Sequence, residues 1–134
     1  MKGKKMKIRR FEDLNCWQEA RKLRKMISEV TRKQLVKKDY VFCDQIKRAA
    51  LSVMSNIAEG FETNTDKEFI NFLNYARRSC GEIRNDLYAA LDDGYIDESE
   101  FNKIYEQACK TGKMISGFIS YLRRSNRTKR LSDD

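Results

Sequence analysis

Proline is absent from this chain of 134 residues, and its apolar side chains recur at intervals of three and four. Proline breaks helix interiors and punctuates loops, so its absence favours long helices joined by short turns. Intervals of three and four place apolar residues along one stripe of a helix. No Asn-Gly pair and no strict apolar–polar alternation predicts a β-hairpin. The sequence therefore predicts an all-α protein.

The apolar stripes divide the chain into four helices, with a bundle spanning residues 11–125. The helices are expected over residues 13–37, 40–60, 65–93 and 97–125. Helices of this length joined by short links pack as antiparallel neighbours, so we expect an up-down-up-down four-helix bundle. Residues 1–10 are expected to form a basic flexible arm, and residues 126–134, which lack periodicity, a disordered tail.

The expected helix ends carry recognisable capping residues. Thr65 is followed three residues later by Glu68, which predicts a capping box at the start of the third helix. A weaker acidic cap of the same kind begins at Asp97. Gly60 and Gly94 are expected to end the second and third helices, because glycine tolerates the left-handed conformation found there.

The composition argues against catalysis and against a bound metal. The chain contains no histidine, which removes Ser-His-Asp and Cys-His chemistry and every histidine-containing metal site. Its four cysteines, Cys16, Cys43, Cys80 and Cys109, form no C-x-x-C pair, so a structural zinc site is not expected. They are expected to be reduced residues in or beside the core. We expect no enzyme, no cofactor and no metal.

The chain also carries no sign of export or membrane insertion. The basic start is not followed by an apolar segment typical of a signal peptide. No apolar run approaches the roughly 20 residues that a membrane-spanning helix needs. We therefore expect a cytoplasmic protein with no membrane partner.

The net charge of +8 is distributed unevenly along the chain. Residues 1–38 carry a net charge of +10, residues 39–119 carry −5, and residues 120–134 carry +3. A polarised distribution permits contact with nucleic acid on one face, and it equally permits charge-complementary contact between subunits.

The basic residues of the first helix are the candidate nucleic-acid-binding residues. They are Arg21, Lys22, Arg24, Lys25, Arg32 and Lys33, with only Glu19 and Glu29 as acids among them. They are either an ordinary solvated helix face or a surface that neutralises phosphates, which gives salt-dependent binding with little sequence choice. No RNP aromatic signature, KH loop or zinc finger accompanies them.

A second set of polar residues comes from two helices that are expected to face each other. It comprises Arg48, Asn56, Glu59, Arg77 and Glu82. A partly buried network of arginines and carboxylates generally fixes packing or subunit register, which is the role we expect. Two alternatives are that Asn56 and Glu59 only bond helix ends or a neighbouring helix, and that Glu59 and Glu82 form a general acid/base pair in a core cavity.

Three stretches of the sequence carry a family resemblance. They are FEDLNCWQEARKL (11–23), QIKRAALSVMSNIAEGFE (45–62) and KEFINFLNYARRSCGEIRNDLYAALDDGYI (67–96). In this order and spacing they resemble the four-helix-bundle family encoded in intervening sequences of bacterial large-subunit ribosomal RNA genes, which also bears a ribosomal-protein label. The family is related in shape to accessory proteins of diversity-generating retroelements. Lys47 and Arg78 depart from the family pattern, and both add surface charge.

The resemblance implies an antiparallel four-helix bundle that assembles into a ring-like homo-oligomer, a pentamer, with an RNA or DNA association. It brings no catalytic residues. We therefore expect a non-enzymatic homo-oligomeric module that binds RNA or DNA non-specifically through the basic face of its first helix. The alternative is an oligomeric scaffold that binds a protein partner and has no nucleic-acid role.

Overall fold

A computed structural model describes residues 8–133, with side chains through Ser125, and it is built almost wholly of helix. A short 3-10 turn (η1, Phe11–Asp13) precedes four α-helices. These are α1 (Asn15–Thr31), α2 (Tyr40–Phe61), α3 (Asp66–Asp92) and α4 (Glu98–Asp133). No strand occurs within residues 8–133, so the all-α prediction is confirmed.

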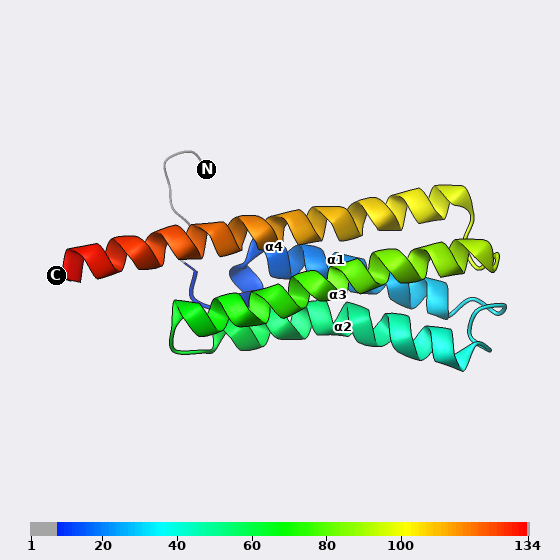
Figure 1. Cartoon of the computed structure of the whole chain (residues 1–134). Helices are drawn as coiled ribbons and strands as arrows, with labels where there is room; N and C mark the ends of the chain where they lie inside the picture. The colour runs from blue at the N-terminus through cyan, green and yellow to red at the C-terminus, as the bar shows by residue number, and fades with distance from the viewer. Residues whose placement is uncertain (1–7, 134) are drawn as a thin grey trace.

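The four helices form an up-down-up-down bundle (Figure 1). α1 packs against α2 and α4, and α3 packs against the same two helices, so each helix has two neighbours. Each helix is joined to the next by a short link, as antiparallel neighbours require. Grooves lie between α1 and α2, between α2 and α3, and between α3 and α4.

The core is filled from the apolar stripes of all four helices. Its fully buried side chains include Leu23 and Ile27 of α1, Ile57 of α2, Leu87 of α3 and Ile115 of α4. These residues belong to one continuous hydrophobic cluster that runs the length of the bundle. No helix within the described residues is both long and apolar enough to cross a membrane.

Two helix ends differ from the expected positions. α1 ends at Thr31, six residues before the expected end at 37, and a turn-rich link follows in which Val36 is fully buried. Val36 N–H and Lys37 N–H both bond to Lys33 O, at 3.1 and 2.9 Å, so the link has its own hydrogen bonds. α4 continues to Asp133 and runs past the other helices (Figure 1), although a disordered tail was expected from 126. Most of the expected basic arm, residues 1–7, lies outside the described residues.

Side chains cap the starts of three helices. Thr65 Oγ1 accepts a hydrogen bond from Glu68 N–H at 3.1 Å, which confirms the expected cap of α3. At α4 the cap is fully reciprocal: Asp97 Oδ1 accepts from Glu100 N–H at 2.8 Å, and Glu100 Oε1 accepts from Asp97 N–H at 3.2 Å. The sequence did not predict the cap of α2, where Asp39 Oδ1 accepts from Phe42 N–H at 3.1 Å.

The two glycines expected to end helices have different roles. Gly94 has a φ of +73° and ends α3 in the left-handed conformation, as predicted. Gly60 lies inside α2 with no positive φ, so the prediction that it ends this helix by a left-handed turn is wrong. A Cβ at Gly60 would come within 2.7 Å of Phe69 Cδ1 and 2.9 Å of Phe72 Cβ. Gly60 is therefore needed because α3 passes too close for a side chain.

Candidate nucleic-acid interface

The six basic residues predicted on the first helix fall into two groups. Lys22 of α1 and Lys33, which lies in the link just after α1, are both paired with acids. Lys22 Nζ lies 3.3 Å from Glu19 Oε2, and Lys33 Nζ lies 2.6 Å from Glu100 Oε2 and 3.1 Å from the carbonyl oxygen of Tyr95. Lys33 therefore ties the α1–α2 link to α4, whereas Lys22 is paired within α1, and both have less of their charge left for an external ligand.

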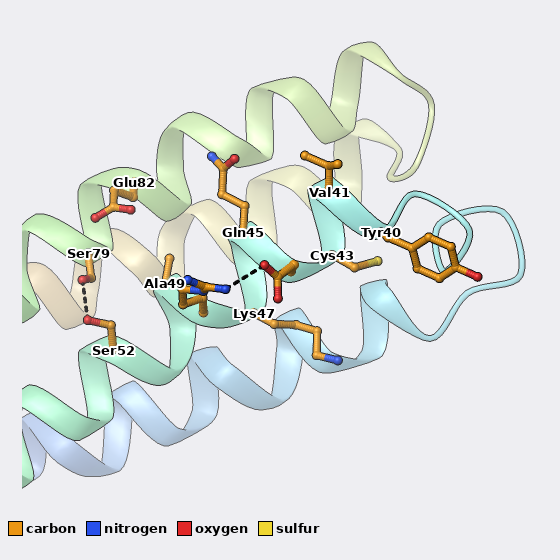
Figure 2. Close-up of a pocket in the computed structure, with 11 residues that line it drawn as sticks. Tyr40, Val41, Cys43, Gln45, Lys47, Ala49, Ser52, Ser79 and Glu82 are labelled. Carbon is orange, nitrogen blue, oxygen red and sulfur yellow. Dashed lines mark hydrogen bonds and ion pairs between the residues drawn. The ribbon is translucent and has the colours of Figure 1, made fainter.

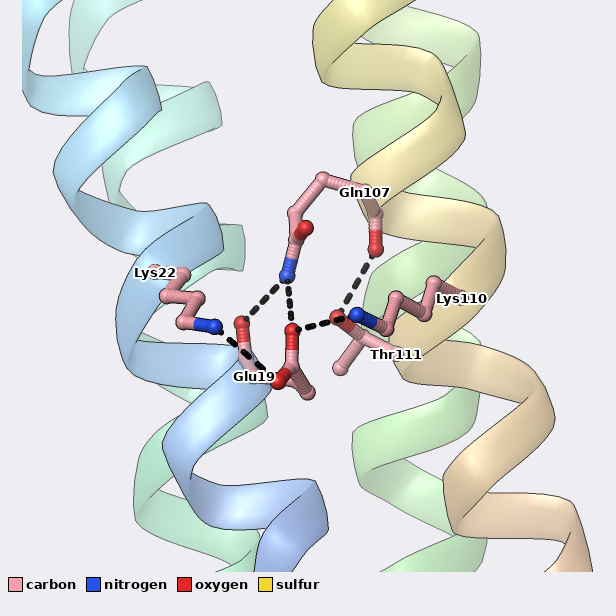
Figure 3. Close-up of polar contacts among 5 residues, drawn as sticks. All are labelled: Glu19, Lys22, Gln107, Lys110 and Thr111. Atoms are coloured by element: carbon pink, nitrogen blue, oxygen red, sulfur yellow. Dashed lines mark hydrogen bonds and ion pairs between the residues drawn. The ribbon is translucent and has the colours of Figure 1, made fainter.

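Glu19 is the centre of the contact between α1 and α4 (Figure 3). Gln107 Nε2 donates to Glu19 Oε1 at 2.9 Å and to the Glu19 carbonyl oxygen at 3.0 Å, and Lys110 Nζ lies 3.5 Å from Glu19 Oε1. The hydrogen bond from Gln107, followed by the contacts with Lys22 and Lys110, lowers the pKa of Glu19 below its ordinary value. A stably ionised carboxylate thus ties the two helices together.

The other four basic residues point away from this contact and are exposed. Arg21 places its guanidinium 5.9 Å from the centre of the Trp17 ring, a cation–π geometry that leaves its charge available. Arg24, Lys25 and Arg32 make no side-chain hydrogen bond or ion pair with any described residue. Arg24 and Lys25 are consecutive on α1, and Arg32, directly after its last residue, is seven positions from Lys25 and eight from Arg24, so Arg32 lies on the same side of the helix as these two. The side chains are therefore free to meet an external anion.

α2 adds further positive charge beside this face. A groove of about 270 Å³ between α1 and α2 is lined by Arg24 from α1 and by Lys47, Arg48 and Asp44 from α2. Arg48 is paired with Asp44 at 2.9 Å, and Lys47 has no hydrogen bond or ion pair with any described residue. We call the exposed set Arg21, Arg24, Lys25, Arg32, Lys47 and Arg48 the α1–α2 basic face.

The sequence did not assign Lys47 to the binding face. The signal was present, because Lys47 and Arg48 are consecutive on the helix that follows the basic one, and consecutive helices of such a bundle are neighbours. What the sequence lacked was the rotation of α2, which places Lys47 in the same groove as Arg24 of α1.

The expected polar network does not assemble within the chain. Arg48 bonds to Asp44, Asn56 Nδ2 donates to the Ser52 carbonyl and hydroxyl oxygens at 2.9 Å each, and Arg77 donates to Asn74 Oδ1 at 2.9 Å. Each of these bonds stays within one helix. Glu59 and Glu82 are exposed and make no hydrogen bond or ion pair with any described residue.

The side-chain hydrogen bonds that do join α2 and α3 come from residues outside the predicted network. Ser79 Oγ donates to Ser52 Oγ at 3.0 Å, and Gln45 Nε2 donates to Asp86 Oδ1 at 3.0 Å. Figure 2 shows the serine pair bridging the two helices, with Glu82 on α3 beyond it. Serines were not predicted here because a single serine on a helix gives no signal that it faces another one.

An open groove of about 860 Å³ lies along α2 and α3 (Figure 2). Its rim carries charges of both signs, Arg48 and Lys47 from α2 and Glu82 from α3, and at one end Tyr40 and Val41 are 81% and 77% exposed. Glu59 does not line this groove, so Glu59 and Glu82 do not share it as a general acid/base pair would.

Asp86 is a buried carboxyl behind the wall of this groove. It is 5% exposed, and its Oδ2 has no hydrogen-bond partner among the described residues. Burial raises the pKa of Asp86 above its ordinary value, although Asn85 and Gln45 oppose the shift through hydrogen bonds. Within the described residues no three cysteine or carboxylate side chains gather in a way that could hold a metal ion.

The helix order and this surface define the class of protein: an antiparallel four-helix bundle with a basic face on its first two helices. The model of the 23S rRNA-intervening sequence protein family matches residues 12–117, and the chain belongs to that family. The resemblance seen in the sequence is thereby confirmed.

The fold is similar to that of a crystallised protein of unknown function from the S23 ribosomal protein family of Bacteroides thetaiotaomicron. The TM-score is 0.71 and the sequences are 21% identical, with 78% of this chain and 97% of that chain covered. At this identity the likeness is one of fold. No curated protein matches the chain.

Proposed function

We propose that this protein is a non-enzymatic helical module that binds RNA or DNA without sequence preference through the α1–α2 basic face. The observation that supports it most is that Arg24, Lys25, Arg32 and Lys47 are exposed and lack an acidic partner among the described residues. Cations left unpaired on a folded surface are available to displace counterions from a phosphate backbone. Such contacts position a ligand but carry no base recognition.

The test is binding of short RNA and DNA, titrated with salt, to paired variants that lose the same charge. Arg24→Gln with Arg32→Gln removes two cations from the face, and Lys67→Gln with Lys103→Gln removes two exposed cations elsewhere. We expect binding at about 50 mM salt, and we expect the affinity to fall steeply as the salt concentration is raised. The first variant is expected to reduce the slope of log K against log salt by about 2, and the second to leave it nearly unchanged. Equal effects from both variants would show that net charge matters and the face does not.

We also propose that copies of the chain associate with each other through the α2–α3 groove. Tyr40 and Val41 expose most of their apolar surface beside it, and exposed apolar patches mark interfaces. A second copy is the fitting occupant because the rim carries charges of both signs, Arg48 and Glu82, and each can meet an opposite charge on a neighbouring copy. The family resemblance leads us to expect a pentamer.

Light scattering of the purified chain tests this association. Val41→Lys with Tyr40→Glu is expected to reduce the mass to that of one chain of 15.8 kDa. An unchanged mass would place the contact elsewhere. An intact oligomer that binds neither RNA nor DNA would favour the alternative function, a scaffold for a protein partner.

A further inference from the structure

The groove between α3 and α4, on the opposite side of the bundle from the α1–α2 basic face, is positively charged without compensation. It has a volume of about 310 Å³. Its lining residues are Arg77, Cys80, Arg84, Ala108, Cys109, Gly112, Lys113 and Ser116. Three are cationic and none is acidic, whereas the α1–α2 groove contains Asp44 and the α2–α3 groove contains Asp44 and Glu82. A groove with this lining attracts an anion.

The three cations are not engaged by other parts of the chain. Arg84 and Lys113 make no hydrogen bond or ion pair with any described residue, and Arg77 bonds only to the neutral amide oxygen of Asn74. All three are exposed. Arg77 and Arg84 lie seven residues apart on α3, about 10 Å along the helix axis. This spacing matches about three phosphates of a stacked strand at roughly 3.4 Å each.

The floor of the groove is small and neutral. Gly112 has no side chain, and a Cβ built there would lie 3.8 Å from Cys80 Cβ. The absence of a side chain at Gly112 therefore leaves the groove deeper at this point. Burial raises the pKa of the Cys80 thiol to about 12, which keeps it uncharged beneath the arginines. Nothing in the floor offsets the positive charge of the walls.

An aromatic ring lies beside the cations. Tyr88 follows Arg84 by one helical turn on α3. The ring is 52% exposed, and it is held from below by Phe101 at 4.9 Å and Tyr105 at 5.8 Å between ring centres. Exposed aromatic faces next to a basic groove are the usual stacking platforms for unpaired bases.

We propose that the α3–α4 groove is a site for single-stranded nucleic acid, in which Arg77, Arg84 and Lys113 contact the phosphates and Tyr88 stacks on a base. This inference rests on the proposed function and adds to it a second site and a preferred strand state. A duplex keeps its bases paired and stacked on each other, so it gains the phosphate contacts but not the contact with Tyr88. The protein then holds a single strand on one side and any phosphate backbone on the other.

The experiment compares a fluorescent single-stranded RNA with the duplex of the same sequence, using the full chain in its native assembly. Arg84→Gln with Lys113→Gln is expected to reduce the salt slope for the single strand by about 1.4, because each phosphate contact on a single strand contributes about 0.7. Tyr88→Leu is expected to weaken single-strand binding roughly 5- to 150-fold, from the contribution of one stacked base, with duplex binding unchanged. Tyr88→Phe keeps the stacking ring and is expected to bind as the unmodified chain does. Mass and melting temperature are measured for each variant.

The outcomes separate this inference from the proposed function. Loss of binding only in the Arg24→Gln, Arg32→Gln variant leaves the α1–α2 basic face in place and overturns the α3–α4 site. Loss of binding only in the Arg84→Gln, Lys113→Gln variant supports the α3–α4 site and overturns binding by the α1–α2 basic face. A changed oligomer mass with unchanged binding in the latter variant would identify the groove as a subunit contact and overturn the site. Absence of binding to any nucleic acid overturns both proposals.

Discussion

At the scale of single residues, Gly60 shows how closely two helices approach. Gly60→Ala puts a methyl group within 3 Å of Phe69 and Phe72, and neither the Phe69 ring nor the helix backbone can move away freely. Overpacking of this kind costs about 1–3 kcal/mol, which exceeds the gain of up to about 1 kcal/mol from alanine's helix propensity. We expect a lower free energy of unfolding in a urea titration.

Gly117 provides the matched control for that substitution. It lies within α4, and a Cβ there meets nothing within 4 Å. Gly117→Ala is therefore expected to raise the free energy of unfolding by up to about 1 kcal/mol. If Gly60→Ala and Gly117→Ala raise the free energy of unfolding equally, the close contact with Phe69 and Phe72 is not the reason that position 60 needs glycine.

Asp86 is the residue whose ionisation works against the fold. Its pKa is raised in the folded state, so the folded chain binds this proton more tightly than the unfolded chain does. Stability from Asp86 is thus complete below the unfolded pKa of about 3.9 and is lost as pH rises through the higher folded value. The side chain at position 86 of the Asp86→Asn variant cannot ionise. We therefore expect the free energy of unfolding of this variant, relative to that of the unmodified chain, to rise from pH 4 to pH 8. Asp92→Asn, an exposed aspartate on the same helix, is the control, and an equal improvement there would remove Asp86 as the cause.

At the scale of helices, the contact between α1 and α4 depends on one carboxylate. Glu19 accepts a hydrogen bond from Gln107 and forms ion pairs with Lys22 and Lys110. These contacts lower its pKa, so the carboxylate is ionised. A lowered pKa stabilises the fold above the unfolded value of about 4.3, and that stability is lost as pH falls through the folded pKa. Glu19→Gln keeps an amide oxygen for Gln107 but loses both ion pairs.

Chemical denaturation at several pH values tests this role of Glu19. Glu19→Gln is expected to unfold more easily than the unmodified chain at pH 7, and the difference should narrow as pH falls below about 4. Glu106→Gln removes an exposed carboxylate of α4 and should show no such convergence. If the free energy of unfolding of Glu19→Gln were lower than that of the unmodified chain by the same amount at every pH, the variant would have lost packing rather than charge interactions.

At the scale of the whole molecule, the sequence was sufficient for the fold and insufficient for the polar contacts. Apolar spacing identified four helices because burial of one stripe is a property of each helix alone. The pairing of Lys33 with Glu100, the bond from Gln107 to Glu19 and the separation of Arg48 from Glu59 depend on how each helix is rotated against its neighbour. A charge count along the chain does not contain that information.

Because all four helices share one hydrophobic core, we expect the bundle to unfold cooperatively. Cys16 on α1 and Cys80 on α3 are 4% and 3% exposed and belong to the same hydrophobic cluster, and burial raises their pKa values to about 11 and about 12. A buried, protonated thiol does not react until it is exposed, so labelling of either cysteine reports unfolding. Cys109 is half-buried beside the α3–α4 groove and should react in the folded protein.

Variants that each keep one cysteine, with the other three changed to alanine, make this measurable with a thiol-reactive dye. We expect Cys109 to label fastest, and Cys16 and Cys80 to label slowly and at the same rate, because exposing either requires the loss of the shared core. Mild urea should accelerate the two slow rates in parallel. Faster labelling of Cys16 than of Cys80 would show that the first helix detaches while α2, α3 and α4 remain packed, and the α1–α2 basic face would then belong to a mobile element rather than to a fixed surface.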